Sequence, residues 1–361
     1  MGHRENPRRL LQSVLLIWIC VFSSSSLCAQ QKHAADELVN KGVVLQDKGE
    51  VDSALSEYNQ ALSIDKDNLL ALAEMAYSLV AIEKYDEAIN YAKKAIKTHP
   101  RDPVLQSVYV SYGNALDGLG KTDKAIDIYN DALKLYPEYY QLYFNRGICQ
   151  NKLHKTEDAI LSFQRSAELN PNHPGTQNAL GLLLYSTTRI PSLFAFCRYL
   201  ILSPNGKRAG ENLNIIETIM IAHVEKSDDK NVTIEVTPEM LNPNKGKQKN
   251  NFSSAELMLS LNSALDSDSS NIRKSAVEKF IRKFSDLCGY LKEIDKDNYG
   301  FYWDYYVPYF TEMNDRNLLE PFAYIVFASS KNEEVTAWLT SHKSEVTVFY
   351  KWSNEFKWRI N

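Results

Sequence analysis

The sequence lacks the local patterns that accompany most catalytic and cofactor sites. It contains no HExxH zinc motif, no GxSxG nucleophile turn, no glycine-rich phosphate loop and no CxxC pair. Its histidines are scattered, and most of its carboxylates stand where helices are expected to begin, a position at which they oppose the helix dipole. We therefore expect a protein that is not an enzyme and that holds neither a metal nor a cofactor.

The sequence also lacks an excess of basic charge, and it has few cysteines and no long apolar run. The formal net charge is −4, which disfavours nucleic-acid binding because such proteins carry a basic stripe. Beyond residue 29 only Cys149, Cys197 and Cys288 remain. Three cysteines form at most one bridge, so we expect no disulfide framework and interpret them as buried thiols. The apolar run Leu15–Phe22 is shorter than the roughly 20 residues of a membrane-spanning helix, so we expect a protein that does not span the membrane.

Residues 1–29 have the pattern of a secretory signal peptide: three arginines, a short apolar core and a small-residue end. We expect cleavage after Ala29 and export to the periplasm or the medium. The rival interpretation is a bacterial lipoprotein that is acylated on Cys28. Leu27 disfavours it, because it stands where the lipoprotein motif requires a small residue.

What the sequence does contain is a repeat of about 34 residues. A small residue recurs at intervals of 34, 37 and 34 residues, a second follows it after seven, and a glycine or alanine precedes it by twelve. The first set is Ala54, Ala88, Ala125 and Ala159, the second is Ala61, Ala95, Ala132 and Ser166, and the third is Gly42, Ala76, Gly113 and Gly147. Such a period is typical of stacked helix pairs, whose axes approach closely only where the contacting side chains are small.

An aromatic residue follows the first small residue after four positions in three units, as Tyr58, Tyr129 and Phe163, while the second unit has Ala92 there. With these positions the pattern resembles the tetratricopeptide repeat family. The resemblance implies an all-α fold, a right-handed superhelical array of antiparallel helix pairs. Apolar residues at helical spacing after residue 252 predict that a helical C-terminal domain follows the array.

The array is expected over residues 35–205 and the other parts on either side of it. The units are about 35–68, 69–102, 106–139, 140–173 and a degraded fifth at 174–205. A capping helix at 206–226, a linker at 227–251 and the helical C-terminal domain at 252–361 complete the chain. The linker is predicted because its Pro, Asn and Lys residues offer little that could be buried.

The resemblance also implies a groove lined by the first helix of each unit. The polar and aromatic residues at its groove positions are Tyr77, Asn114, Asp117, Gln141, Phe144, Asn145 and Asn178. Asn114 and Asn145 match the asparagines with which some family members hold a peptide backbone, since an amide both donates and accepts. The lysines or arginines that grip a terminal carboxylate are replaced by Val110, Gly175 and Ala179. The expected partner is therefore an extended or helical segment of another protein.

Outside the array, eight of the twelve residues in Tyr299–Phe310 are aromatic. A platform of Tyr302, Trp303, Tyr305 and Tyr306 could stack on sugar rings. The alternative is that most of these rings are core, because that much exposed aromatic surface would be adhesive.

The sequence therefore predicts an exported bacterial scaffold that holds another protein in the cell envelope without chemistry of its own. One alternative is a factor associated with carbohydrate or peptidoglycan through the aromatic platform, which requires that these rings are exposed. Another is an enzyme in the C-terminal domain, which requires a pocket with convergent polar groups.

Overall fold

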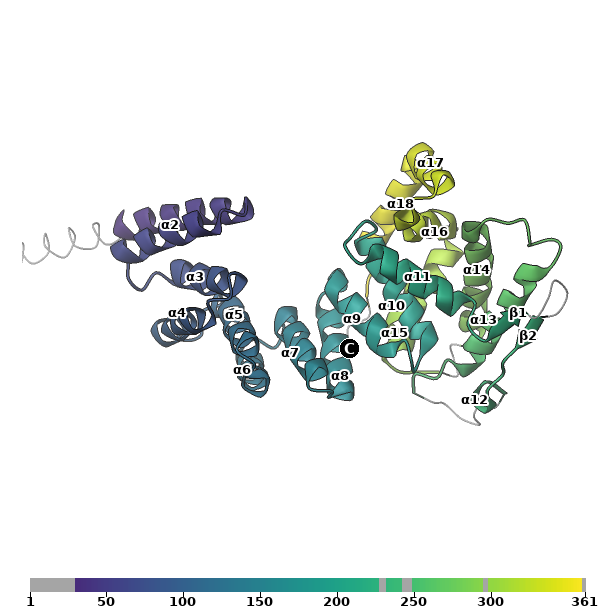
Figure 1. Ribbon diagram of the computed structural model, residues 1–361, viewed down its shortest axis with the longest axis horizontal. Helices are drawn as coiled ribbons and strands as arrows, with labels where there is room; N and C mark the ends of the chain where they lie inside the picture. The colour runs from purple at the N-terminus through teal and green to yellow at the C-terminus, as the bar shows by residue number, and fades with distance from the viewer. Residues whose placement is uncertain (1–29, 227–231, 242–248, 295–297, 359–361) are drawn as a thin grey trace, which may run out of the picture. The chain divides into compact units, whose positions relative to one another are not determined.

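The computed structural model describes residues 30–226, 232–241, 249–294 and 298–358. The predicted signal peptide, with Cys28, lies outside the described residues. The chain forms two compact units, residues 1–155 and 156–361, so the division falls between the two helices of the predicted fourth repeat. Helices make up nearly all of the regular structure (Figure 1), which confirms the all-α class. Within the described ranges, no helix is both long enough and apolar enough to span a membrane.

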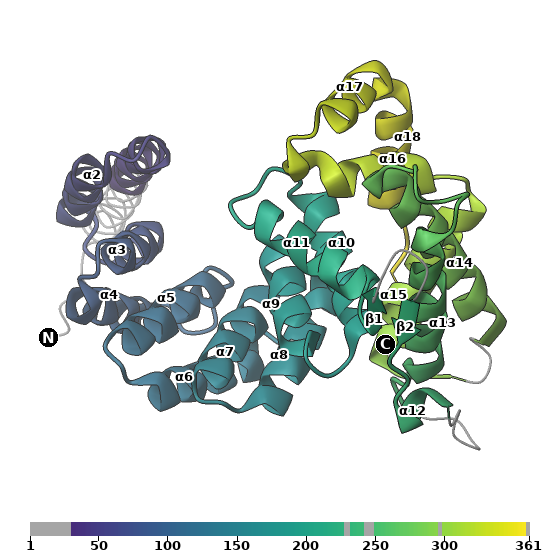
Figure 2. The ribbon, with the colours of Figure 1, turned by 45° about the vertical axis from the view of Figure 1, so that its right-hand side comes forward.

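The N-terminal unit consists of alternating first and second helices. A helix over residues 30–47 is followed by α2 (Val51–Ile64), α3 (Leu69–Ala81), α4 (Tyr85–Thr98), α5 (Leu105–Gly118), α6 (Thr122–Leu135) and α7 (Tyr140–Lys152). Each helix packs on the next, and α5 also packs on both α3 and α7. The first helices α3, α5 and α7 therefore form one layer of this unit, as Figure 2 also shows.

Glycine sets the distance between the two helices of a repeat. A Cβ atom placed on Gly113 would lie less than 3.0 Å from three atoms of the Tyr129 ring, and Gly42 stands in the same relation to Tyr58. Both rings are fully buried. The first helix can therefore lie directly on the aromatic ring of the second only where it carries no side chain.

The second repeat achieves the same packing with different residues. Ala76 replaces the glycine and Ala92 replaces the tyrosine, and both are fully buried. In the second repeat, the methyl groups of these two alanines fill part of the space between the helices. In the first and third repeats a tyrosine ring packed against a glycine fills that space. The departure at Ala92 is thus matched by a change at the residue that it faces.

The C-terminal unit begins with the second helix of the fourth repeat. Its elements are α8 (Thr156–Leu169), α9 (Pro174–Leu184), α10 (Arg189–Leu202), α11 (Ala209–Met220), β1 (Val224–Lys226), β2 (Val232–Ile234), α12 (Pro238–Leu241), α13 (Ser253–Ala264), η1 (Leu265–Ser267), α14 (Ala276–Ile294), α15 (Phe301–Asp315), α16 (Leu319–Val326), η3 (Phe327–Ser330), α17 (Glu333–Ser341) and α18 (Lys343–Glu355). α14 and α15 pack on each other, and α10 packs on α9, α11, α13, α15 and α16. Repeat helices and C-terminal helices therefore share one core.

The region predicted as a linker takes part in this unit. β2 pairs antiparallel with β1. Met240 is buried, and the backbone carbonyl of Asn251 accepts a hydrogen bond from Trp303 Nε1 at 3.1 Å. The structure thus differs from the predicted linker, because residues at its described ends are fixed against the core.

Candidate protein-binding site

The predicted groove residues of the N-terminal unit lie on the layer formed by α3, α5 and α7. Within each helix they are three, four or seven residues apart, a spacing that places them on one side of the helix. We call this surface the first-helix face; its residues are Leu70 and Tyr77 on α3, Asn114 and Asp117 on α5, and Gln141, Phe144, Asn145 and Ile148 on α7. The predicted partner-binding residues Tyr77, Asn114, Asp117, Gln141, Phe144 and Asn145 thus all lie on first helices of this unit.

Large apolar side chains are exposed on this face. Tyr77 is 57% exposed, Leu70 42% and Ile148 41%. The phenol ring of Tyr77 offers apolar area together with a polar tip, a combination that suits contact with another protein. Helix packing within the unit leaves these three side chains available.

The two asparagines of the face have complementary free groups. The hydroxyl of Tyr129 donates to Asn114 Oδ1 at 2.7 Å, which leaves the amide NH₂ of Asn114 to donate. The Nδ2 group of Asn145 donates to the carbonyl of Gln141 at 2.8 Å, which leaves its oxygen to accept. The pair can therefore offer one donor and one acceptor to a polypeptide backbone.

Asp117 has a structural role within the face. Its carboxylate accepts from Thr122 Oγ1 at 2.6 Å and pairs with Lys152 Nζ at 2.9 Å. The hydrogen bond to Asp117 raises the pKa of Lys152. Because this pair joins the end of α5 to the end of α7, both charges are largely satisfied within the unit.

The cysteine of the N-terminal unit is a buried free thiol, as predicted. Cys149 is 2% exposed. Burial, with a smaller contribution from the negative charge of Asp117, raises the pKa of its thiol to about 12. At neutral pH the group is therefore protonated, and it acts as a small apolar side chain.

Asn178 was predicted as part of the groove, but the structure places it in the C-terminal unit and buries it. It is 7% exposed, and its Oδ1 accepts from Asn212 Nδ2 at 2.9 Å. Asn212 follows Asn178 after 34 residues, so α11 continues the period of the repeat, and its Asn212 contacts α9 at Asn178. The prediction of Asn178 as a partner-binding residue is corrected on this ground.

The predicted aromatic platform is buried as well. Its four residues are at most 4% exposed: Tyr302, Trp303, Tyr305 and Tyr306. α15 packs on both α10 and α14, and the hydroxyl of Tyr306 donates to Gln177 Oε1 at 2.6 Å within that core. An exposed platform at these residues is therefore wrong, and with it the carbohydrate-associated role that depended on them.

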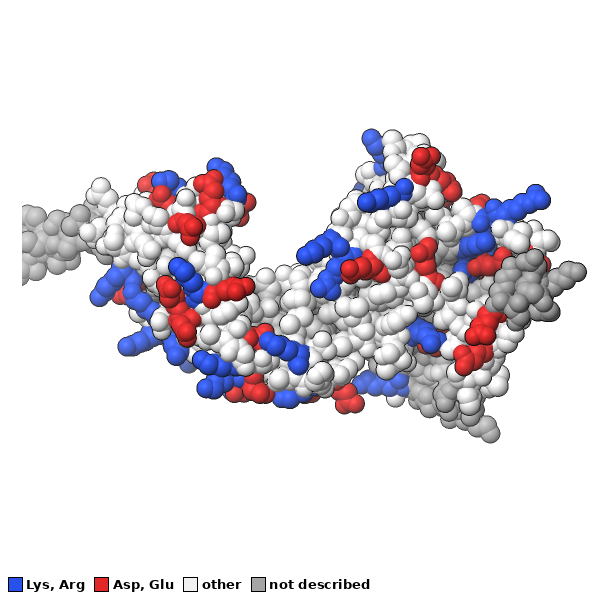
Figure 3. Space-filling view, viewed as in Figure 1, with Lys and Arg blue, Asp and Glu red and all other residues white. Residues whose placement is uncertain are grey.

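Two of the second helices of the N-terminal unit carry several lysines. α4 contains Lys93, Lys94 and Lys97, and α6 contains Lys124 and Lys134. Figure 3 shows Lys and Arg side chains gathered over these helices, with acidic residues among them. The exposed apolar residues of the first-helix face thus lie on a different set of helices from these five lysines.

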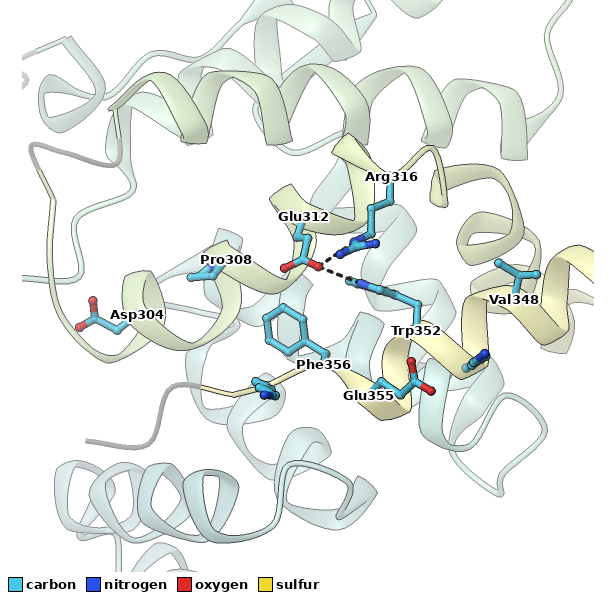
Figure 4. A pocket seen from close by; sticks show the side chains of 10 residues that line it. Asp304, Pro308, Glu312, Arg316, Val348, Trp352, Glu355 and Phe356 are labelled. Atoms are coloured by element: carbon cyan, nitrogen blue, oxygen red, sulfur yellow. Dashed lines mark hydrogen bonds and ion pairs between the residues drawn. The ribbon is translucent and has the colours of Figure 1, made fainter.

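A hollow in the C-terminal unit was not predicted from the sequence. It has a volume of about 540 Å³ and lies along α15 and α18 (Figure 4). Residues from the two helices are more than thirty positions apart in the chain, so no local motif marks it.

Comparison with known proteins gives matches in the repeat region. Models of the tetratricopeptide repeat match residues 45–110 and 113–174. The small glutamine-rich tetratricopeptide repeat-containing protein of Dictyostelium discoideum is 28% identical over 187 residues, 52% of this chain and 53% of that protein. The Hsp70-Hsp90 organising protein of Plasmodium falciparum is 25% identical over 117 residues, 32% of this chain and 45% of that protein. The chain thus spans about half the length of these relatives.

Among solved structures, a thermophilic tetratricopeptide repeat protein of Thermus thermophilus is similar, with a TM-score of 0.45 and 21% identity. The similarity covers 51% of this chain and 99% of that one. PilW, described as a type IV pilus biogenesis factor, gives a TM-score of 0.44 and 20% identity over 50% of this chain and 82% of PilW.

Proposed function

We propose that the protein is a non-enzymatic scaffold that binds a segment of another protein on its first-helix face. The premise is that residues 45–110 and 113–174 of this chain match tetratricopeptide repeats. Tetratricopeptide repeat proteins bind other proteins or peptides, and this face is the surface of the N-terminal unit suited to that work. The observation that carries the proposal is the exposure of Tyr77, Leu70 and Ile148 beside two amides with complementary free groups.

The amides and the apolar side chains have separate tasks in this proposal. The free NH₂ of Asn114 donates to a backbone carbonyl of the bound segment, and the free oxygen of Asn145 accepts from a backbone N–H. Such contacts fix the direction of the segment but do not distinguish between its side chains. Tyr77 and Ile148 then contact the apolar side chains of the partner and supply most of the affinity.

We propose that the bound segment is internal to its protein rather than a chain end. Recognition of a terminal carboxylate needs a free cation in the groove. Val110 occupies one of the positions at which the family places that cation, and Lys152 is paired with Asp117.

The experiment is a pull-down from envelope extract with the full chain and two triple variants. Tyr77→Ala/Asn114→Ala/Asn145→Ala changes the first-helix face. Asn59→Ala/Asn90→Ala/Leu135→Ala is the matched control, because these residues are exposed on the second helices α2, α4 and α6. Circular dichroism verifies that both variants are folded.

We expect the first variant to lose a partner that the wild type and the control both retain. Retention of that partner by the first variant would refute binding at this face. Loss of it by the control alone would place the site on the second helices.

We also propose that the scaffold acts in the bacterial envelope, on the strength of the sequence pattern of residues 1–29. Expression of the full chain in a bacterial host should give an exported protein whose first residue is Gln30. An intact N-terminus in the cytoplasmic fraction would refute export, and incorporation of labelled fatty acid that is lost in Cys28→Ser would establish the lipoprotein alternative.

A further inference from the structure

The hollow of the C-terminal unit is built from one stripe of each of two helices. Asp304, Pro308 and Glu312 follow one another every four residues along α15, and Arg316 is the C-cap of that helix. Val348 and Trp352 lie four residues apart on α18, and Phe356 is its C-cap. Figure 4 shows both stripes around the same space. We call it the α15–α18 trough. Its volume of about 540 Å³ is in the range of small-molecule sites, which is about 300–1,000 Å³.

One wall of the trough is aromatic and is held in place from behind. The rings of Trp352 and Phe356 are half-buried, and their centroids lie 4.9 and 5.0 Å from that of Tyr309. Tyr309 is fully buried, and its hydroxyl is hydrogen-bonded to Ser353 at 2.7 Å. The two outer rings are therefore supported in one orientation, and each keeps part of its surface toward solvent.

The opposite side of the trough presents a carboxylate next to a guanidinium. Glu312 Oε1 accepts from Arg316 Nε at 2.7 Å and from Trp352 Nε1 at 3.1 Å. Within the described part of the chain, no hydrogen bond is found for Glu312 Oε2 or for the terminal nitrogens of Arg316. Glu312 Oε2 can therefore accept a hydrogen bond, and the two terminal nitrogens of Arg316 can donate, next to the aromatic wall.

The charges around the trough balance. Three acidic residues, Asp304, Glu312 and Glu355, face three basic residues, Arg316, Lys351 and Lys357. A site with no net charge gives little advantage to an anion or a cation. It favours a neutral ligand that carries many hydroxyl groups and also has an apolar surface.

From this combination we infer that the α15–α18 trough binds a neutral saccharide. The C–H face of a sugar ring stacks on Trp352 and Phe356, which combine apolar area with little conformational freedom. Neighbouring hydroxyls donate to Glu312 Oε2 and accept from Arg316, and such charge-assisted hydrogen bonds are stronger than neutral ones. The site differs in position from the first-helix face and does not depend on the proposed function.

The test is calorimetric titration of the full chain with cellotetraose, maltotetraose, laminaritetraose and N-acetylchitotetraose at millimolar concentration. Arg316→Met and Glu312→Gln remove the donor and the charge of the acceptor on exposed or partly exposed side chains, so both should fold. Arg273→Met is the matched control, since Arg273 is exposed outside the trough. We expect at least one saccharide to bind, and each trough variant to weaken it by about 10- to 100-fold, with no change in the control.

Two results would overturn the inference. One is that none of the four saccharides binds the wild type. The other is that a saccharide binds equally well to the wild type and to Arg316→Met and Glu312→Gln. Titration with glutamate, lysine and inorganic phosphate completes the test, because tighter binding of any of these than of the saccharides would assign the trough to a charged ligand and contradict the inference.

Discussion

Replacing Gly113 by alanine tests whether a glycine sets the spacing within a repeat. The new Cβ would lie less than 3.0 Å from three atoms of the Tyr129 ring. The ring cannot turn away easily, because it is fully buried and its hydroxyl is bonded to Asn114. Overpacking costs about 1–3 kcal/mol, and alanine recovers about 1 kcal/mol through its helix propensity. We expect the free energy of unfolding to fall by up to about 2 kcal/mol.

The same substitution should have the opposite sign when the ring is absent. Tyr129→Ala alone should cost about 3–5 kcal/mol as a large-to-small core change. In that background, Gly113→Ala meets no ring and should stabilise by about 1 kcal/mol. The double variant reproduces the pair that the second repeat already uses, Ala76 and Ala92. The difference between the two backgrounds, about 1–3 kcal/mol, is the size expected for residues in contact.

Urea unfolding followed by circular dichroism measures the free energy of unfolding of the wild type, the two single variants and the double variant. Gly289→Ala gives the propensity gain alone, since Gly289 lies in α14 and a Cβ there meets nothing within 4 Å. Equal dependence on urea concentration across the set would show that the variants expose similar surface on unfolding. The spacing argument would be wrong if Gly113→Ala cost the same with and without the Tyr129 ring.

Two further predictions concern residues that the sequence had assigned to binding. Burial raises the pKa of Tyr302 from 10.0 to about 12. The protonated hydroxyl therefore contributes stability below pH 10, and this contribution is lost as the pH rises from 10 through 12. Over that interval the urea midpoint of the wild type should fall more steeply than that of Tyr302→Phe, and parallel curves would contradict this. Asn178→Ala should lower the free energy of unfolding by about 1–3 kcal/mol, because buried Asn212 loses its hydrogen-bond acceptor; thermal melting measures this. Capture of the partner protein in the pull-down should persist. Loss of capture by a folded Asn178→Ala variant would show that Asn178 belongs to the binding site.

The repeat region could be predicted because its information is local. The positions of Ala54, Ala61 and Tyr58 within one repeat determine how its two helices pack, and the same spacing recurs along the chain. The C-terminal part has no such repeat, so no period indicates where its helices begin. α14, for example, begins at Ala276, directly after a turn.

Contacts between distant segments could not be predicted in this way. Nothing near Asn178 indicates that Asn212 will cover it, although the interval of 34 residues was a usable signal for a further first helix. The burial of Tyr306 likewise depends on α10 and α14, which pack on two sides of α15. Composition alone shows that most rings of such a run must be buried, but it does not show which side of the helix remains in contact with solvent.

The non-aromatic residues of the same segment did contain that information. Asp304, Pro308, Glu312 and Arg316 recur every four residues, the spacing of one helical stripe, so a helix that buries its aromatic rings must turn this stripe outward. The same reasoning separates the two proposed sites. The first-helix face belongs to the N-terminal unit and the trough to the C-terminal unit, and no residue is shared. Arg316→Met should therefore leave partner capture unchanged, and Tyr77→Ala should leave saccharide binding unchanged, since substitutions at sites with no shared residues act additively.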